Sequence, residues 1–163
     1  MLINELLDME KLIAGKMAFE CQVQSVLPLV QQALTENASY ADKYSVKYVL
    51  TDASGGALIY VDGFRLQQVL NNFLSNAAKY SPPNAFVDID ITIKGEWLRM
   101  SVFDHGAGIT DEFKSRIFQK FSQADSSDSR QKGGTGLGLA ISKELVERMG
   151  GRIGFDTKLG EGT

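Results

Sequence analysis

The chain of 163 residues lacks three features that would assign it to other classes of protein. Its single cysteine, Cys21, excludes an internal disulfide and fits a reducing compartment. Its net charge of −3 provides no basic field for nucleic acid. No apolar run approaches the roughly 18 residues that cross a bilayer, and acidic residues interrupt the apolar N-terminus, which is unlike a signal peptide. We therefore expect a soluble, cytoplasmic domain without direct membrane contact, whether or not a parent protein is membrane-anchored.

The composition, 44% hydrophobic and 23% charged, suits one globular domain with a core. Periodicity and turn residues predict strands over 19–23, 45–51, 57–61, 85–93, 97–104 and 152–157. They predict helices over 1–14, 26–41, 63–80, 110–118 and 137–149. Residues 122–136 are rich in Ser, Asp, Gln and Gly and predict a mobile surface loop. We expect an α+β fold, with one layer of helices on a mixed, mostly antiparallel sheet.

The N-terminal segment places Leu2, Leu6, Met9 and Ile13 at the 4-3-4 spacing of a coiled-coil seam. Fewer heptads are present than a coiled coil needs, so a helix docked on the domain surface is an equal alternative.

One predicted helix carries two amides and a cation on one face. Asn72, Asn76 and Lys79 follow at spacings of four and three residues, which stack side chains above one another on a helix. Gln68 extends this stripe by one turn towards the N-terminus. A solvated polar face is the alternative interpretation, although asparagine works against the helix that it occupies.

Two glycine-rich motifs follow this helix. Asp104-His105-Gly106-Ala107-Gly108 closes a predicted strand, where glycines allow a flat ligand to approach the backbone. A carboxylate there can accept a hydrogen bond from an exocyclic amine, which favours adenine over the O6 acceptor of guanine. An ordinary glycine turn with an Asp cap is the alternative.

The second glycine motif is GGTGLGL (133–139), which opens the predicted helix 137–149. Free N–H groups and the dipole at a helix N-terminus suit phosphate. The motif is neither a P-loop nor a dinucleotide fingerprint, because the Gly-Lys-Ser/Thr of the first and the third glycine of the second are missing. By itself it could also be a flexible linker. An anionic ligand in this acidic chain would need local compensation, most simply by a divalent cation.

These motifs occur in a diagnostic order, with IFQKF (117–121) between the two glycine motifs. Together they resemble the N, G1, F and G2 boxes of sensor histidine kinases, which share the Bergerat-type ATP-binding superfamily with DNA gyrase and mismatch-repair ATPases. QQVLNNFLSNAAKYS, FDHGAGI and GGTGLGLAISKELVERMGG match closely, and the resemblance covers essentially the whole chain. It implies a Bergerat-type two-layer fold. Residues 1–15 would end the dimerisation hairpin helix, and 16–163 would form the catalytic domain, whose last strand is cut short.

The resemblance implies roles for individual residues. Asn76 would ligate Mg²⁺ through its amide oxygen, because magnesium prefers oxygen ligands and keeps several waters. Asn72 would lie near the phosphates and Lys79 would meet one of them, so these two are the candidate catalytic residues. Asp104 would recognise the adenine amine, and Tyr80 would lie along the nucleotide.

Further contacts to ATP are expected around this centre. In the last glycine box, Thr163 would contact the adenine edge. Residues 119–135 would form the ATP lid, in which Arg130 and Lys132 are candidate cations, with a solvated role as an equal alternative. The remaining expected ATP contacts are Gly106, Gly108, Ile109, Phe118, Phe121, Gly134, Thr135, Gly136, Leu137, Gly138 and Leu139.

The implied reaction is phosphoryl transfer from MgATP to a histidine on a dimerisation hairpin, and then to an aspartate of a response regulator receiver domain. His105, the only histidine, lies beside the expected base site, so we expect it to be a spectator. The acceptor histidine would belong to a hairpin helix that this chain lacks. The chain should then bind MgATP without phosphorylating itself.

Two other functions remain as alternatives. A gyrase-type ATPase switch carries a glutamate general base four residues before the metal-binding asparagine, where this chain has Asn72. A nucleotide-free, partner-binding domain would show a broken motif, and every motif here is intact.

Overall fold

The structure is a computed structural model that describes residues 10–11, 14–15, 17–106, 138–156 and 161–163. The described elements are β1 (Gln22–Ser25), α2 (Val26–Glu36), α3 (Ala38–Tyr44), β2 (Lys47–Asp52), β3 (Leu58–Val61), α4 (Gly63–Tyr80), β4 (Phe86–Lys94), β5 (Trp97–Phe103) and α7 (Gly138–Arg148). The predicted helices over 1–14 and 110–118, and the loop over 122–136, lie wholly or almost wholly outside the described residues.

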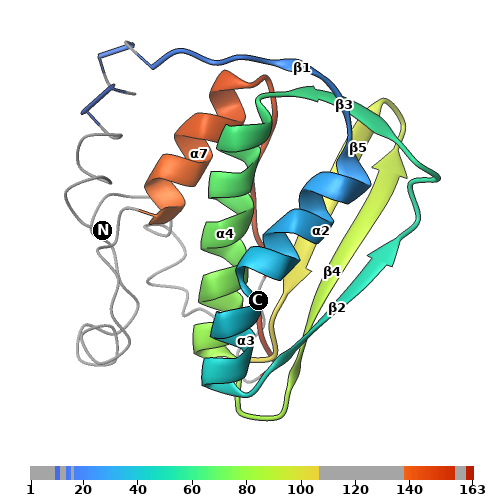
Figure 1. The fold of residues 1–163 in the computed structure, drawn as a ribbon, viewed down its shortest axis with the longest axis vertical. Coiled ribbons are helices and arrows are strands. Elements are labelled where there is room, and N and C mark those ends of the chain that lie inside the picture. The colour runs from blue at the N-terminus through green and yellow to red at the C-terminus, as the bar shows by residue number, and fades with distance from the viewer. Residues whose placement is uncertain (1–9, 12–13, 16, 107–137, 157–160) are drawn as a thin grey trace.

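The strands form two small sheets beneath a single layer of helices (Figure 1). The larger sheet has the order β2-β4-β5, with β2 parallel and β5 antiparallel to β4. The smaller sheet pairs β1 with β3 in antiparallel orientation. Two of the three pairings are antiparallel, and the helices cover one face of the larger sheet. The expected two-layer α+β fold is confirmed.

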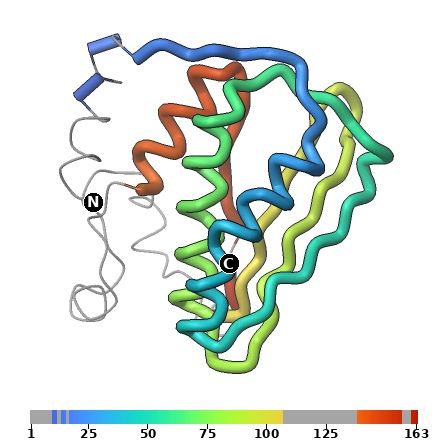
Figure 2. Tube along the Cα trace, viewed as in Figure 1, coloured from blue at the N-terminus to red at the C-terminus, as the bar shows by residue number. Residues whose placement is uncertain are grey.

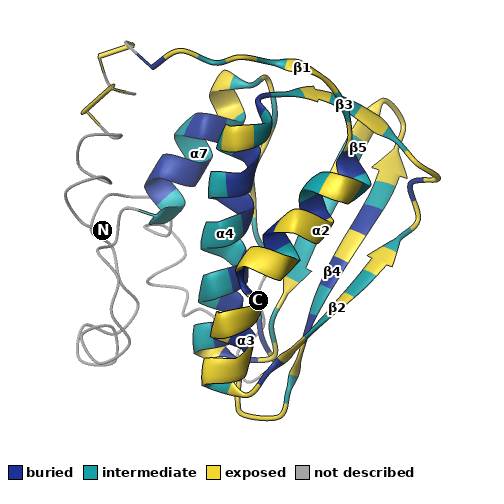
Figure 3. Ribbon diagram, viewed as in Figure 1, coloured by how far each residue is buried: buried dark blue, intermediate teal, exposed yellow. Residues whose placement is uncertain are grey.

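The main core lies between α4 and the inner face of β4. Val87, Ile89 and Ile91 alternate along β4 and are at most 1% exposed, as is Leu74 of α4. A second apolar cluster fixes α7 against the other side of α4, through Val69, Ile141 and Leu145. Figure 3 shows these buried positions on the facing sides of α4, α7 and β4. Helix α4 is therefore held from two sides and forms the rigid centre of the domain.

Both ends of α4 follow the sequence signals. The Asp62 carboxylate caps the helix by accepting hydrogen bonds from the N–H groups of Phe64 at 3.0 Å and Arg65 at 3.3 Å. The helix ends at Tyr80, directly before Ser81 and the two prolines, which cannot continue it. The predicted helix 63–80 is confirmed at both boundaries.

The predicted single helix over 26–41 is wrong, because the chain forms two helices that meet at Asn37. The Asn37 side chain donates hydrogen bonds to the Ala33 carbonyl at 2.8 Å and to Asn71 Oδ1 on α4 at 2.7 Å. An asparagine amide competes for backbone groups in this way and ends a helix. The second helix ends at Tyr44, and Ser45 follows it in the left-handed region at φ 55°. The strand predicted over 45–51 therefore begins two residues later, at Lys47.

The strand predicted over 152–157 is also wrong for its described part, residues 152–156. The alternating exposure of a strand is present, since Ile153 and Phe155 are half-buried between exposed neighbours. Alternation reports which face a side chain occupies, whereas a strand requires ladder hydrogen bonds with a neighbour. Instead, this segment passes behind α4 (Figure 2), and its Arg152 guanidinium stacks 4.4 Å from the centre of the Trp97 ring on β5.

The hairpin expected at 85–93 and 97–104 is confirmed as β4 and β5, with Gly95 supplying a positive φ of 60° in the turn. The strand predicted at 19–23 is shifted, since β1 covers Gln22–Ser25. In the part of the chain that the structure describes, no helix has the length and apolar character that crossing a membrane requires.

Candidate functional site

Helix α4 presents the predicted polar stripe along one side of its C-terminal half. Asn72, Asn76 and Lys79 are half-buried, and Tyr80 is 42% exposed at the end of the helix. The apolar side of the same helix is committed to the two core clusters. The stripe is thus held on a rigid element, at the edge of the core, where side chains can meet a ligand without unfolding the helix.

The first residue of the stripe is packed against the start of α7. Asn72 Nδ2 donates to Ser142 Oγ at 3.3 Å, and Ser142 is only 2% exposed. Gly138 lies so close to the Asn72 amide that a Cβ at this position would overlap its oxygen and come within 2.9 Å of its Cγ. A glycine at this position therefore lets the start of α7 pack closely against the stripe. The sequence-based site missed Ser142, whose only signal was its position one helical turn after Gly138.

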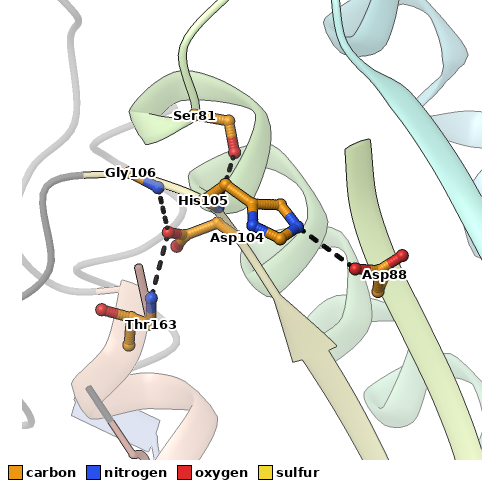
Figure 4. Close-up of polar contacts among 6 residues, drawn as sticks. All are labelled: Ser81, Asp88, Asp104, His105, Gly106 and Thr163. Atoms are coloured by element: carbon orange, nitrogen blue, oxygen red, sulfur yellow. Dashed lines mark hydrogen bonds and ion pairs between the residues drawn. The ribbon is translucent and has the colours of Figure 1, made fainter. Parts of the chain in front are cut away.

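Asp104 follows β5 and is oriented by backbone N–H groups from two segments (Figure 4). Its Oδ1 accepts hydrogen bonds from Gly106 at 2.9 Å and from Thr163 at 3.2 Å. Both of these bonds end on Oδ1, and no hydrogen bond from a described residue ends on Oδ2, so Oδ2 is the oxygen that could accept from a ligand's donor. Desolvation by burial raises the pKa of the Asp104 carboxyl, while the two N–H groups and the nearby His105 partly oppose that rise.

Two glycines allow the backbone to close around this carboxylate. A Cβ on buried Gly106 would overlap the Tyr80 carbonyl oxygen and lie 3.2 Å from Asp104 Oδ1. Gly162, at φ +129°, lies against the Asp104 carbonyl, and the Asp104 N–H donates to the Thr163 carbonyl at 2.7 Å. The Asp104 turn therefore packs against the end of α4, which links it to the stripe through Tyr80.

His105 is turned away from Asp104 Oδ1 and onto the sheet. Its Nε2 lies 3.2 Å from Asp88 Oδ2 on β4, and its ring meets Phe103 edge-on at 5.0 Å between centroids. Its backbone N–H donates to Ser81 Oγ at 3.4 Å, a second contact that sequence reasoning missed. His105 is thus fixed at the end of the sheet by neighbours from β4, β5 and the cap of α4.

The structure brings part of the predicted site together around α4. The end of this helix meets the Asp104 turn, which is bonded to Thr163, while Asn72 meets Gly138 at the start of α7. Leu139 follows on α7 and is half-buried. The other predicted site residues lie outside the described residues: Gly108, Ile109, Phe118, Phe121, Gly134, Thr135, Gly136 and Leu137, with the candidate lid cations Arg130 and Lys132.

Whether a metal ion fits this site depends on the ligand atoms that its residues offer. Among the described residues, no group of three His, Cys, Asp or Glu side chains could hold a metal alone. The Asn76 amide offers one hard oxygen ligand at a half-buried position. Magnesium is commonly held by one or two protein oxygens together with phosphates and waters, so this donor set fits Mg²⁺ that arrives with a nucleotide.

Comparison with known proteins agrees with this geometry. Residues 61–163 match the family described as histidine kinase-, DNA gyrase B- and HSP90-like ATPase. The chain belongs to this ATPase family. Sensor protein GacS of Pseudomonas syringae pv. syringae is 41% identical over 167 residues, which cover 99% of this chain and 18% of GacS. Sensor histidine kinase WalK of Bacillus subtilis is 32% identical over 164 residues, covering 99% and 27% respectively.

Solved structures show the same relationship. Full-length ShkA in complex with AMPPNP is 32% identical with a TM-score of 0.82, covering 99% of this chain and 33% of ShkA. Acinetobacter baumannii histidine kinase AdeS shares the fold at 20% identity, with a TM-score of 0.80 over 99% of this chain and 73% of AdeS. This member of the ATPase family therefore shares the fold of solved histidine kinases over nearly its whole length. It spans about a fifth of GacS and about a quarter of WalK.

Proposed function

We propose that this ATPase-family domain binds MgATP against α4 and donates the γ-phosphoryl group to a histidine on a dimerisation hairpin. An aspartate of a response regulator receiver domain would receive the group next. The observation that carries the proposal is the Asp104 carboxylate, whose Oδ1 accepts from two backbone N–H groups and whose Oδ2 has no donor among the described residues. A fixed acceptor beside a glycine turn suits the amine of adenine.

In this proposal the base lies at the Asp104 end of the site. Asp104 accepts a hydrogen bond from the adenine amine, and Gly106 keeps the wall thin enough for a flat base. Thr163 borders the same edge, because its N–H already bonds Asp104 Oδ1. Tyr80, exposed at the end of α4, lies along the nucleotide.

The phosphates lie along the stripe. Asn76 holds Mg²⁺ through its amide oxygen, and Lys79 meets a phosphate as a point charge. When bound, the magnesium neutralises phosphate charge, which is the main chemical demand of phosphoryl transfer. Asn72 lies beside Gly138 at the start of α7, and its contacts with Gly138 and Ser142 support a positioning role near the phosphates.

The residue at position 72 favours transfer over hydrolysis. A carboxylate there could take a proton from water as general base, whereas an amide cannot. The Asn72 amide also donates to Ser142, a buried partner that holds it in place. The domain therefore protects ATP until an acceptor side chain reaches the γ-phosphoryl group.

The acceptor in this proposal lies outside the chain, and residues 1–15 join the catalytic domain, 16–163, to the hairpin that carries it. The contacts of His105 with Asp88 and Phe103 support its exclusion, because they hold the imidazole on the sheet beside the base end of the site. A phosphoacceptor would have to approach the opposite, phosphate end.

A transfer assay tests this function. The chain is incubated with magnesium and γ-labelled ATP, with and without the parent's dimerisation hairpin supplied as a separate polypeptide. We expect acid-labile label on the hairpin and none on the chain. Asn76→Ala should abolish transfer, whereas Asn71→Ala, on the neighbouring side of α4, should retain it. Acid-labile label on the chain alone would instead identify His105 as the acceptor and refute the assignment.

A further inference from the structure

The segment that precedes β1 contributes a buried side chain to the contact between α4 and α7. Met17 is only 7% exposed. It belongs to the apolar cluster that fixes α7 against α4, together with Val69, Ile141 and Leu145. Phe19, two residues further along, packs against the same cluster. The segment before β1 therefore takes part in the contact that places α7.

A backbone hydrogen bond fixes this segment a second time. The Glu20 N–H donates to Asp62 Oδ2 at 2.9 Å, while the other oxygen of this carboxylate caps α4. Asp62 is 8% exposed, so the bond lies in surroundings of low dielectric, where it is stronger than in water. Residues 17–20 are thus tied to the α4–α7 cluster at one end and to the start of α4 at the other.

The same cluster adjoins the phosphate end of the proposed site. Val69 lies one helical turn before Asn72 on α4, and Ile141 directly precedes Ser142 on α7. Asn72 and Ser142 are joined by the hydrogen bond of 3.3 Å. A cavity of about 360 Å³ opens beside this pair, and Gly138 and Ile141 also line it. A shift of α7 on α4 therefore changes the surroundings of Asn72.

The position of α7 depends on such contacts. The helix has 11 residues, and an isolated helix of that length is marginal in water. Removing a buried methionine side chain leaves a cavity that its neighbours close only in part, so the packing around it loosens. Loss of the Met17 side chain should therefore change how closely Gly138 and Ser142 meet Asn72.

From these contacts we propose that Met17 is a positioning residue, which ties the segment before β1 to the phosphate end of the site. It acts through α7, by keeping Gly138 and Ser142 against Asn72, and takes no part in binding nucleotide or magnesium. The inference rests on the proposed function, because that function places Asn72 near the phosphates. It makes nucleotide affinity depend on a residue outside every nucleotide-binding motif.

The first test is NMR of the ¹⁵N-labelled chain without nucleotide. We expect Met17→Ala to shift the Asn72 side-chain NH₂ signals, while those of Asn84, in the turn before β4, stay in place. Met17→Leu conserves the side-chain volume and should leave both sets of signals unchanged. Met100→Ala is the matched control, because Met100 packs against the other apolar cluster, and it should not move the Asn72 signals.

The second test is calorimetric titration of the same variants with MgATP. Met17→Ala should bind MgATP about fivefold more weakly, at the lower end of the usual range for coupled sites. Met17→Leu and Met100→Ala should bind like the unmodified chain. Ser142→Ala removes the hydrogen-bond partner of Asn72, so the additional loss from Met17→Ala should be smaller in that background. If Met17→Ala is poorly folded, Met17→Val removes less volume and carries the same expectations.

Unchanged Asn72 signals and unchanged MgATP affinity in folded Met17→Ala would overturn the proposal. Equal effects of Met17→Ala and Met100→Ala would also overturn it, because they would report a general loosening of the core. Additive losses in Met17→Ala and Ser142→Ala would contradict the route through α7. If the unmodified, folded chain binds no MgATP, the proposed function fails, and the Asn72 signals alone decide whether Met17 positions that residue.

Discussion

Asp104→Asn should shift the preference of the proposed site from adenine towards guanine, rather than only weaken nucleotide binding. In the folded domain Oδ1 of Asp104 accepts hydrogen bonds from the Gly106 and Thr163 N–H groups. In the proposed function, Oδ2 then accepts from the adenine amine. An asparagine at this position must keep its oxygen on those two donors, because its NH₂ group cannot accept them. The NH₂ group then stands where Oδ2 was, and a donor meets the adenine amine.

The expected loss of ATP-binding free energy has two causes. The variant lacks a charge-assisted hydrogen bond and leaves two donors facing each other, which together cost about 3 kcal/mol of ATP binding. That cost corresponds to roughly a hundredfold weaker affinity. The O6 atom of guanine is an acceptor, so GTP should gain affinity in the variant by accepting from the new NH₂ group. Stability should not fall, since desolvation already raises the pKa of Asp104 and disfavours its charged form in the folded state.

The assay is calorimetric titration of the unmodified chain and the variant with MgATP and MgGTP, with thermal unfolding of each sample. Asp90→Asn, an exposed aspartate on β4, is the matched control and should keep the preference for ATP. The reasoning is refuted if Asp104→Asn binds ATP within threefold of the unmodified chain, or if its preference for ATP over GTP is unchanged.

Three further outcomes follow from the same contacts. Burial raises the pKa of the Asp104 carboxyl in the free protein. ATP affinity, measured by calorimetry, should therefore fall as the pH is lowered through that pKa, because the carboxylate becomes protonated. Asp104→Asn should remove this pH dependence. Gly106→Ala should cost about 1–3 kcal/mol of unfolding free energy through overlap with the Tyr80 carbonyl, whereas Gly154→Ala, with nothing within 4 Å of its Cβ, should change chemical denaturation little. Burial raises the pKa of Tyr48 from 10.0 to about 12, so its contribution to stability is complete below pH 10 and is lost as pH rises towards 12; Tyr48→Phe should remove that loss in alkaline denaturation.

The sequence predicted the parts of the fold that local chemistry determines. Helix α4 has a capping aspartate, an apolar stripe and terminal prolines, and each signal lies within its own residues. The β4–β5 hairpin likewise carries its turn within the segment. The break at Asn37 was not predictable in this way, because it depends on a hydrogen bond to Asn71, 34 residues further along the chain.

In the candidate site, too, local features could be predicted from the sequence and long-range contacts could not. Residue types and spacing predicted Asn72, Asp104 and Gly106 as candidate site residues, because their chemistry is carried by their own side chains or by the lack of one. The contacts that orient them were not predictable, since Ser142 lies 70 residues from Asn72 and Thr163 lies 59 residues from Asp104. The strand expected over 152–157 failed for a related reason, because pairing depends on a neighbour that alternation does not specify.

Titration of the unmodified, folded chain with ATP in the presence and absence of magnesium tests the central claim most directly. We predict saturable binding of one ATP per chain, weakened when magnesium is removed and weakened by Asn76→Ala in the presence of magnesium only. A folded sample that shows no binding at millimolar ATP, or binding that is indifferent to both magnesium and Asn76, would contradict the account.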